Sequence, residues 1–206
     1  MSPNASERLG VAPAPDGLSA VQDFINTGAA DLPDLLADTA TAEQWFSSVL
    51  AGHAGEEHDL PVVFTERDLH KLVDLRSRLR QTLRDRHQDD EPAGWIVPTG
   101  VAVGLRQASD GTVVAVPRGT GWRLVASLLL TESLLAQQKN LWPRLKVCRN
   151  PVCRTAFYDR SRNNIGVWHD VLICGNAINL RTSRARRRAA ATAADDPPAP
   201  SAPGQV

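Results

Sequence analysis

The feature that most limits what this chain can fold into is a cluster of four potential metal ligands in its C-terminal part. Cys148 and Cys153 are separated by four residues, as are His169 and Cys174, and fifteen residues lie between the two pairs. The sequence has only three cysteines, and all of them lie here. Zinc prefers four tetrahedral sulfur and nitrogen ligands. The spacing therefore predicts a zinc site in which a hairpin joins the two ligand pairs.

Three thiolates and one imidazole fill all four positions of such a site, so we expect a structural metal with no position open to substrate. A segment this short cannot build a sufficient hydrophobic core, and zinc is therefore expected to be needed for its folding. The alternative is three reduced thiols beside an unrelated histidine. An odd number of clustered cysteines argues against a disulfide framework in either case.

Charge is unevenly distributed along the chain. Residues 1–140 carry 12 Lys/Arg and 19 Asp/Glu, whereas residues 141–206 carry 11 and 4. A basic end of this kind predicts a polyanionic partner. The first ten residues show no secretion signal, and the longest apolar stretch, residues 124–136, is too short to span a membrane. We expect a cytoplasmic protein with no membrane association.

Hydrophobic spacing predicts mostly helices. Four are expected, at residues 18–27, 41–50, 65–83 and 122–138. Thr65 has the character of an N-cap, and Thr41 with Gln44 forms a capping-box pattern. The Asp110-Gly111 turn between two β-branched stretches predicts a β-hairpin.

The predicted fold class is therefore mainly α with a small β-hairpin: a helical N-terminal domain followed by a small, treble-clef-like zinc module. Composition divides the chain into a flexible leader at 1–17, the helical domain at 18–142, the zinc module at 143–188 and a disordered Ala/Pro tail at 189–206.

The residues around the four ligands resemble the CGNR zinc-finger family. The matching positions are Cys148, Cys153, Phe157, Tyr158, Asp159, Ser161, Arg162, Asn163, Trp168, Cys174, Gly175 and Asn176. More loosely, the body is similar to the helical partner domain of that family, for example at residues 24–27. The resemblance implies a stress-induced transcription regulator.

Three positions depart from the family pattern. His169 stands where the family has cysteine, a change that zinc accepts because imidazole and thiolate are both good ligands. Ala177 replaces the arginine of the family signature, and residues 164–167 lack the basic residues that relatives often carry. The first change is expected to leave the metal site intact, whereas the other two alter positions that make the family's surface contacts.

A helix beginning near the last cysteine would carry a cluster of arginines. Arg181, Arg184 and Arg188 share one face at helical spacing, with Arg186 and Arg187 nearby. Such a helix can bind DNA phosphates and reach guanine edges in the major groove. The alternatives are a solvated basic helix end and a protein-binding surface, the latter making the zinc module an adaptor.

The N-terminal body is a possible sensor domain. Five residues could line a small-molecule effector pocket: Asn26, Thr27, Trp45, Arg76 and Trp95. In the simpler interpretation, Asn26 and Thr27 form a helix C-cap. The arginines at positions 76, 78, 80 and 84 then form a solvated helix face, and the alternative is that two of them line a ligand pocket. We expect a homodimer because many transcription regulators are dimers, and no residue of the sequence indicates it.

Catalytic motifs are missing from the sequence: there is no glycine-rich phosphate loop, nucleophile elbow or telling pair of carboxylates. Asp159 is expected to accept hydrogen bonds from backbone groups or an arginine that brace the zinc module. We therefore predict a non-enzymatic protein with no catalytic residues. A ligand-binding or enzymatic N-terminal domain with a structural finger is the alternative.

Overall fold

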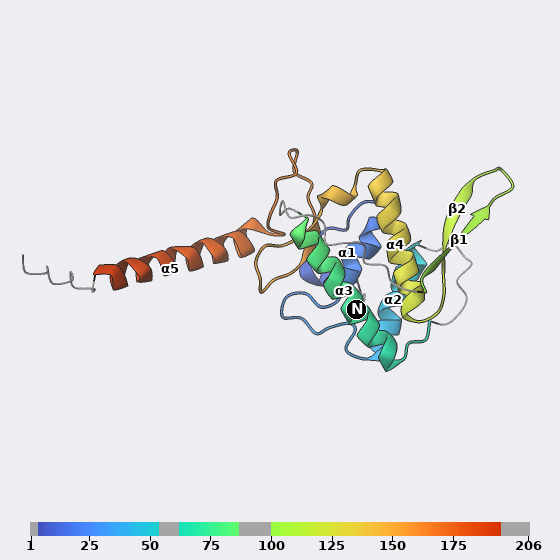
Figure 1. The fold of residues 1–206 in the computed structure, drawn as a ribbon, viewed down its shortest axis with the longest axis horizontal. Helices are drawn as coiled ribbons and strands as arrows, with labels where there is room; N and C mark the ends of the chain where they lie inside the picture. The colour runs from blue at the N-terminus through green and yellow to red at the C-terminus, as the bar shows by residue number, and fades with distance from the viewer. Residues whose placement is uncertain (1–3, 54–61, 87–99, 195–206) are drawn as a thin grey trace, which may run out of the picture. The chain divides into compact units, whose positions relative to one another are not determined.

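The computed structural model describes residues 4–53, 62–86 and 100–194, so Trp95 and the end of the predicted tail lie outside the described residues (Figure 1). Two compact units are present, residues 1–169 and residues 170–206. The described α-helices are α1 (Leu18–Asn26), α2 (Thr39–His53), α3 (Glu66–Asp85), α4 (Trp122–Gln138) and α5 (Asn176–Ala194). The first four belong to the first unit and confirm the four predicted helices.

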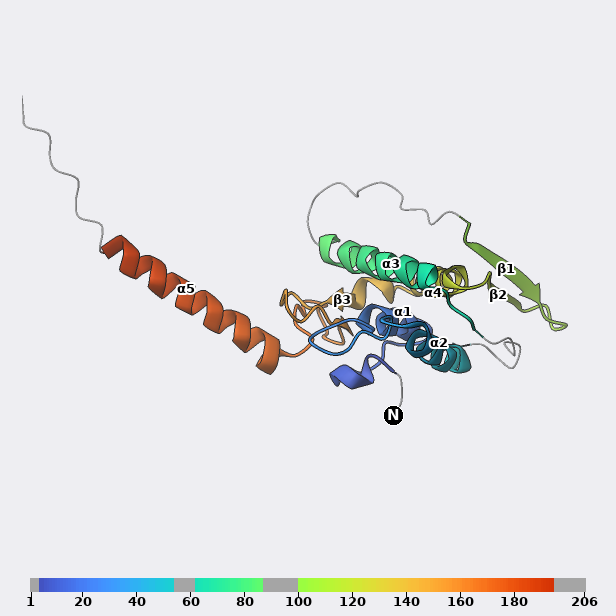
Figure 2. The ribbon, with the colours of Figure 1, turned by 90° about the horizontal axis from the view of Figure 1, so that it is seen from below.

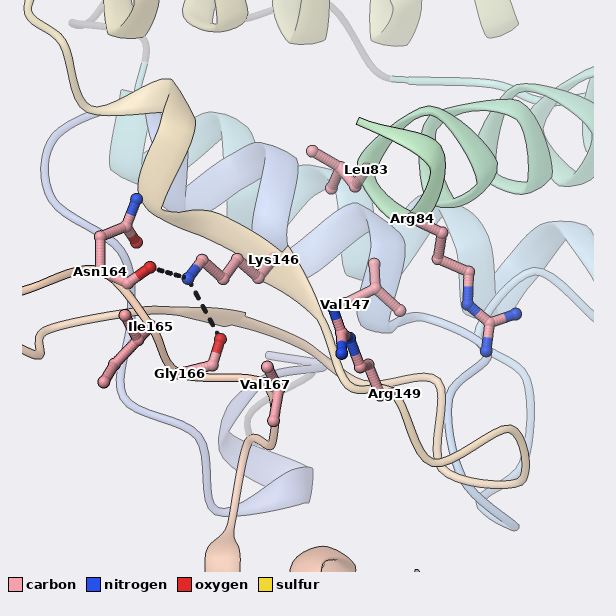
Figure 3. Close-up of a pocket in the computed structure, with 9 residues that line it drawn as sticks. All are labelled: Leu83, Arg84, Lys146, Val147, Arg149, Asn164, Ile165, Gly166 and Val167. Atoms are coloured by element: carbon pink, nitrogen blue, oxygen red, sulfur yellow. Dashed lines mark hydrogen bonds between the residues drawn. The ribbon is translucent and has the colours of Figure 1, made fainter. Parts of the chain in front are cut away.

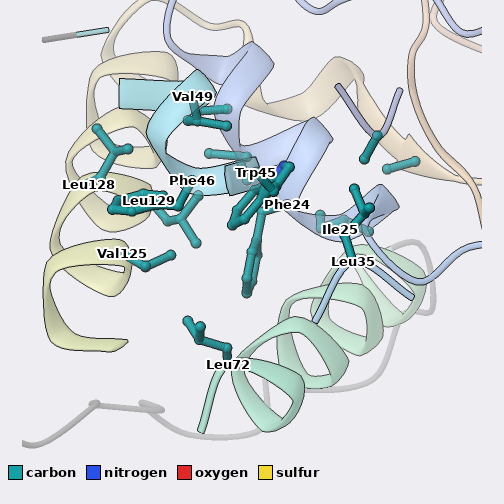
Figure 4. Close-up of a cluster of buried hydrophobic side chains, with 14 of the residues drawn as sticks. Phe24, Ile25, Leu35, Trp45, Phe46, Val49, Leu72, Val125, Leu128 and Leu129 are labelled. Atoms are coloured by element: carbon teal, nitrogen blue, oxygen red, sulfur yellow. The ribbon is translucent and has the colours of Figure 1, made fainter. Parts of the chain in front are cut away.

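The core of the first unit lies between these four helices (Figure 4). Phe24 of α1 and Trp45 of α2 lie with ring centroids 5.8 Å apart, and Phe46 continues the aromatic series. Leu72 of α3 and Val125 of α4 close the cluster, and all five side chains are almost fully buried. Burial of this apolar surface is the main force that holds the helices together.

Two helix starts follow from capping. Thr65 caps α3 as predicted, because its hydroxyl accepts from the Asp68 backbone N–H and the Asp68 carboxylate accepts from the Thr65 N–H. The predicted capping box at Thr41 is wrong. Helix α2 begins earlier, and the Asp38 carboxylate accepts hydrogen bonds from the backbone N–H and hydroxyl of Thr41.

The predicted β-hairpin is present. Strands β1 (Ala102–Gln107) and β2 (Val113–Arg118) pair antiparallel, with Leu105 opposite Ala115. The hairpin is held at its base by Ser127 of α4, whose hydroxyl donates to the Ala102 carbonyl and accepts from the Arg118 N–H.

The N-terminal segment packs against α1, in contrast to the flexible leader that its composition predicts. It contains a short 3₁₀ helix, Glu7–Leu9. The buried carboxylate of Asp23 accepts from the backbone N–H groups of Ala5 and Ser6, and the Gln22 side chain binds Ala14 and Ala12. Two polar side chains on α1 thus satisfy backbone groups of the leader, which allows this segment to be buried.

A second antiparallel hairpin, β3 (Leu145–Val147) and β4 (Ala156–Tyr158), follows the 3₁₀ turn Trp142–Arg144. Its residues Leu145, Val147 and Ala156 belong to the same hydrophobic core as the helices. Strand β3 lies beside α3 (Figure 2), and β4 contacts α1. The first half of the predicted zinc module is therefore packed directly onto the helical body.

Asn26, at the C-terminal end of α1, clamps this hairpin. Its amide nitrogen donates to the Ala156 carbonyl at 3.0 Å, and its amide oxygen accepts from the Ala156 N–H at 2.7 Å. The side chain thereby satisfies both backbone groups of one β4 residue. Since these residues lie 130 positions apart, the clamp connects the first helix to the metal-binding region.

The arginines of α3 are not the uniformly solvated face that the sequence suggests. Arg76 and Arg80 are buried. Arg76 makes two hydrogen bonds of 2.6 Å to the Asp34 carboxylate, and Arg80 donates to the carbonyls of Ile25 and Gly28. Burial lowers the pKa of Arg80 to about 10, and the neighbouring Arg76 adds to this effect.

The second unit, described by itself, contains a π-helical turn, Val171–Gly175, and α5. The predicted helix after the last cysteine is thus present, and it also includes residues 189–194 of the predicted tail. With five α-helices and two short β-hairpins among the described residues, the chain has the mainly α architecture that the sequence predicts. Among the described residues, no helix has the length and apolar composition required to cross a membrane.

Candidate metal centre

The first ligand pair lies on a tight turn between β3 and β4. Cys148 directly follows β3, and its backbone N–H donates to the Thr155 carbonyl at 2.8 Å. The Cys153 N–H donates to the Asn150 carbonyl at 3.1 Å. These bonds close the turn and direct both thiols to the same side. Arg154 has a φ of 54°, a left-handed conformation that reverses the chain after the second ligand.

Four side chains form one candidate metal cluster. The Sγ atoms of Cys148, Cys153 and Cys174 and a ring nitrogen of His169 all lie within 4.8 Å of one another. Thiolates bound about 2.3 Å from a tetrahedral zinc ion lie about 3.8 Å apart, so these separations are compatible with four ligands of one ion. The donor set fits zinc, and the predicted ligands are brought together.

The three cysteines form no disulfide with one another in the structure. All three thiols are free and buried. Within the first unit, Cys153 Sγ lies 3.2 Å from His169 Nδ1 and 3.0 Å from the Thr155 hydroxyl. Such contacts favour a thiolate, which is the form that binds metal.

The two thiols of the first pair differ in acidity. The hydrogen bond to Cys148 lowers the pKa of Cys153 most strongly, and His169 and Thr155 contribute, so that this pKa falls to about 3. The same hydrogen bond, followed by burial, raises the pKa of Cys148. A divalent ion bound between the two sulfur atoms would hold both as thiolates.

The fourth ligand is positioned by a local turn. Asp170 caps the π-helical turn, with its carboxylate accepting from the Ile173 N–H at 2.8 Å. The Cys174 N–H donates to the Asp170 carbonyl at 2.9 Å, and Cys174 is buried. The turn therefore determines where the last sulfur lies relative to its own backbone.

A buried ion pair braces the loop between the two ligand pairs. Asp159 accepts from Lys146 Nζ and from the backbone N–H groups of Ser161 and Gly166, each within 2.9 Å. Burial by itself raises the pKa of Asp159, but these hydrogen bonds outweigh burial and hold the pKa well below its ordinary value. The predicted bracing role of Asp159 is confirmed, with a lysine as its charged partner.

The five arginines predicted to bind DNA all lie on α5. Their side chains are exposed: Arg181, Arg184, Arg186, Arg187 and Arg188. No acidic residue occurs in α5. The structure places them on one helix that starts two residues after the last metal ligand, as the sequence suggests.

The predicted effector residues have internal partners. Thr27 is the C-cap of α1 and accepts a hydrogen bond from Arg76, while the indole N–H of Trp45 donates to Asp23. Asn26 holds β4, as described above. The C-cap interpretation of Thr27 is confirmed, and effector binding by these residues stays a prediction.

Sequence reasoning missed two residues that shape the site. Lys146 neutralises Asp159, and its position between two hydrophobic β3 residues is the signal that could have identified it. Gly166 approaches the Asp159 carboxylate so closely that an added Cβ would lie 2.9 Å from it. Only the folded structure reveals that contact.

A comparison with models of known protein families gives a match. Residues 144–187 match the family model of the CGNR zinc finger, and this segment contains all four candidate ligands. No curated protein matches the chain. The family resemblance predicted from the residues around the ligands is therefore confirmed for this segment.

Proposed function

Since the chain carries a CGNR zinc finger at residues 144–187, we propose that it is a zinc-stabilised transcriptional regulator that binds duplex DNA through α5. The observation that carries this proposal is the exposed arginine series on a helix attached directly to the metal-ligating turn. The metal serves as a structural anchor, and the N-terminal helical domain remains available as a ligand sensor.

The arginines form a stripe rather than a ring. At about 100° per residue, Arg181, Arg184, Arg187 and Arg188 fall within roughly 120° of the helix circumference, whereas Arg186 lies on the other side. A stripe of guanidinium groups suits the phosphates on the two edges of a major groove, and individual members can reach guanine. Residues 141–206 contain only four acidic residues, so few carboxylates are present to pair with the arginines or to repel DNA phosphates.

The metal site supports a binding role rather than catalysis. Four protein ligands complete the tetrahedral shell of zinc and leave no position for a substrate or a reactive water. We propose that zinc fixes the start of α5, so that the arginines are presented on an ordered helix. Buried free thiols suit a reducing compartment, which supports the cytoplasm as the place of action.

The test is a salt titration of binding to random duplex DNA with the zinc-loaded full chain. The wild type is compared with the Arg181/Arg184/Arg187/Arg188→Ala variant. We expect the log–log salt slope of the variant to be smaller by up to about 3.6, because each of the four lost phosphate contacts on duplex DNA contributes about 0.9. Equal slopes, or no binding of the wild type at low salt, would refute the proposal.

Two single substitutions form a matched control. Arg187→Ala and Arg186→Ala remove the same charge from neighbouring positions on different sides of α5. If the stripe binds DNA, the first substitution weakens binding more than the second. An equal loss would mean that only net charge matters.

One observation favours a second function, protein binding by the zinc module. Val171, Leu172 and Ile173 are exposed by 66%, 78% and 66%, although all three are aliphatic and adjoin the Cys174 ligand. Consecutive exposed aliphatic residues are typical of interaction surfaces. A photo-crosslinking residue at position 172 would identify a partner in cells, and the purified partner should bind the Leu172→Ser variant at least ten-fold more weakly than the wild type.

A further inference from the structure

A cavity of about 490 Å³ lies in the first unit, between the C-terminal end of α3 and the loops that carry the first metal ligands. Figure 3 shows its lining residues, from Leu83 and Arg84 of α3 to the β3 segment and residues 164–167. Its volume is in the range of pockets that bind small organic molecules. Of the predicted effector residues that the structure describes, Asn26, Thr27, Trp45 and Arg76, none lines it.

The cavity has an apolar middle. Leu83, Val147, Ile165 and Val167 line it with aliphatic side chains from three separate segments. Ile165 is 73% exposed, so it offers its apolar surface to whatever enters. This lining favours a ligand with a flat or aliphatic body over a small, fully hydrated ion.

Two guanidinium groups provide positive charge on one side. Arg84 and Arg149 line the cavity, and in the described part of the chain neither side chain has an acidic partner. Lys146 also lines it, but its ammonium group is bound to Asp159 and to the carbonyls of Asn164 and Gly166. Arg84 and Arg149 therefore carry the charge that remains for an anion, and arginine binds carboxylates and phosphates in paired hydrogen bonds.

Asn164 provides an acceptor on the other side (Figure 3). Its side-chain nitrogen donates to the Pro143 carbonyl, whereas its Oδ1 atom is buried and has no hydrogen-bond donor among the described residues. In this structure Oδ1 has almost no exposed surface, so a ligand hydroxyl or amine would meet it only once the side chain turns toward the cavity. Because a buried polar atom without a partner is costly, that hydrogen bond would favour the turn.

From these observations we propose that this cavity is a binding site for an elongated amphipathic organic anion. A carboxylate or phosphate at one end pairs with Arg84 and Arg149, an apolar body contacts the aliphatic middle, and a hydrogen-bond donor at the far end meets Asn164. The site goes beyond DNA binding and uses none of the α5 arginines. Arg149 and Val147 flank the metal ligand Cys148, so the anion would bind next to the metal-binding turn.

The concave shape argues against nucleic acid as the occupant. Phosphate contacts on duplex DNA come from projecting cationic side chains, whereas this cavity is bounded by aliphatic side chains and offers only two uncompensated charges. A small anion can use both the charge and the apolar surface.

The probe is 6-hydroxy-2-naphthoate, which is fluorescent and has a carboxylate and a hydroxyl at opposite ends. It is titrated into the zinc-loaded full chain, alongside 2-naphthoate, which lacks the hydroxyl, and 2-naphthol, which lacks the carboxylate. We expect saturable binding of 6-hydroxy-2-naphthoate, with each analogue binding more weakly. Equal binding of the probe and 2-naphthol would overturn the proposal.

Variants assign the binding to the cavity. Arg149→Gln should weaken binding of the probe roughly ten-fold or more, because the charge-assisted pair with its carboxylate is lost. Arg149 is exposed, so the substitution should leave the fold intact. Asn164→Ala should remove the preference for the hydroxyl-bearing probe over 2-naphthoate. The control is Arg78→Ala, because Arg78 is an exposed arginine of α3, the helix that carries Arg84, and lies outside the cavity lining.

Two outcomes would contradict the site. Unchanged affinity in Arg149→Gln would place the probe elsewhere on the protein. A short duplex DNA is then added to the probe complexes of the wild type and of the Arg181/Arg184/Arg187/Arg188→Ala variant. If the DNA displaces the probe equally from both proteins, Arg84 and Arg149 belong to a nucleic-acid surface. Probe binding that DNA does not compete with supports the cavity and is independent of whether α5 binds DNA.

Discussion

Lys146 Nζ lies 2.7 Å from Asp159 Oδ2, and the two side chains are only 7% and 4% exposed. This pair connects β3, which leads into the first metal ligand, with the loop that leads to His169. Two further carbonyls satisfy the ammonium group, and two backbone N–H groups satisfy the carboxylate. The ligand-bearing loops are therefore joined by a fully hydrogen-bonded buried charge pair.

The first prediction concerns this pair. Asp159→Asn leaves the Lys146 ammonium buried without a counter-charge, so we expect the free energy of unfolding of the zinc-loaded protein to fall by roughly 3–5 kcal/mol. Urea unfolding measures it. Arg78→Ala, which breaks the exposed pair with Asp74, should change stability by less than about 1 kcal/mol. Similar losses in both variants would show that the buried pair has no special role.

The second prediction concerns the metal ligands. The His169→Cys variant should keep one equivalent of zinc, because zinc accepts four thiolates, whereas His169→Ala and Cys148→Ser should lose most of it. Atomic emission of the purified proteins gives the metal content. His70→Ala, at an exposed position on α3, is the histidine control and should bind zinc normally. Less than half an equivalent in the wild type would disprove the metal site.

The third prediction uses two glycines with opposite surroundings. A Cβ at position 166 would lie 2.9 Å from the Asp159 carboxylate, whereas a Cβ at position 52, in α2, meets no atom within 4 Å. Gly166→Ala should therefore destabilise the protein by about 1–3 kcal/mol, and Gly52→Ala should stabilise it by up to about 1 kcal/mol through helix propensity. Thermal unfolding compares them, and a stabilising Gly166→Ala would exclude the close contact.

The fourth prediction concerns pH. Burial raises the pKa of Asp34, but hydrogen bonds from Arg76 and the Leu36 N–H outweigh it and lower the pKa below the ordinary value. A lowered folded pKa means that the stabilisation is fully present above the unfolded value of about 3.9 and is lost as pH falls through the folded value. Asp34→Asn should lower the free energy of unfolding by about 1–2 kcal/mol at neutral pH. This is less than for a fully buried ion pair, because Asp34 is 35% exposed and solvent screens the interaction.

Urea unfolding of the wild type and Asp34→Asn at several pH values measures this dependence. The difference in stability should be constant between about pH 7 and pH 5 and should shrink below about pH 4. Loss of metal in acid affects both proteins equally because they share the same ligands. A difference that grows as the pH falls would contradict the ion pair.

Local patterns predicted the elements that depend on nearby residues. The α3 start at Thr65, the hairpin turn at Asp110-Gly111 and the helix after Cys174 all follow from caps, turn residues and spacing within a few positions. The capping box at Thr41 failed because Asp38 competes for the same backbone group, and the pattern alone does not rank two neighbouring caps.

The sequence by itself determined the candidate metal ligands, since their identity and spacing restrict the chemistry whatever surrounds them. Only the tertiary structure decided what the other polar residues do. Arg76 meets Asp34 across 42 positions and Asn26 meets Ala156 across 130, so neither burial nor partner can be read from a local pattern. A polar side chain looks solvated in sequence until a distant segment folds over it and satisfies its hydrogen bonds, which is the condition for burying it.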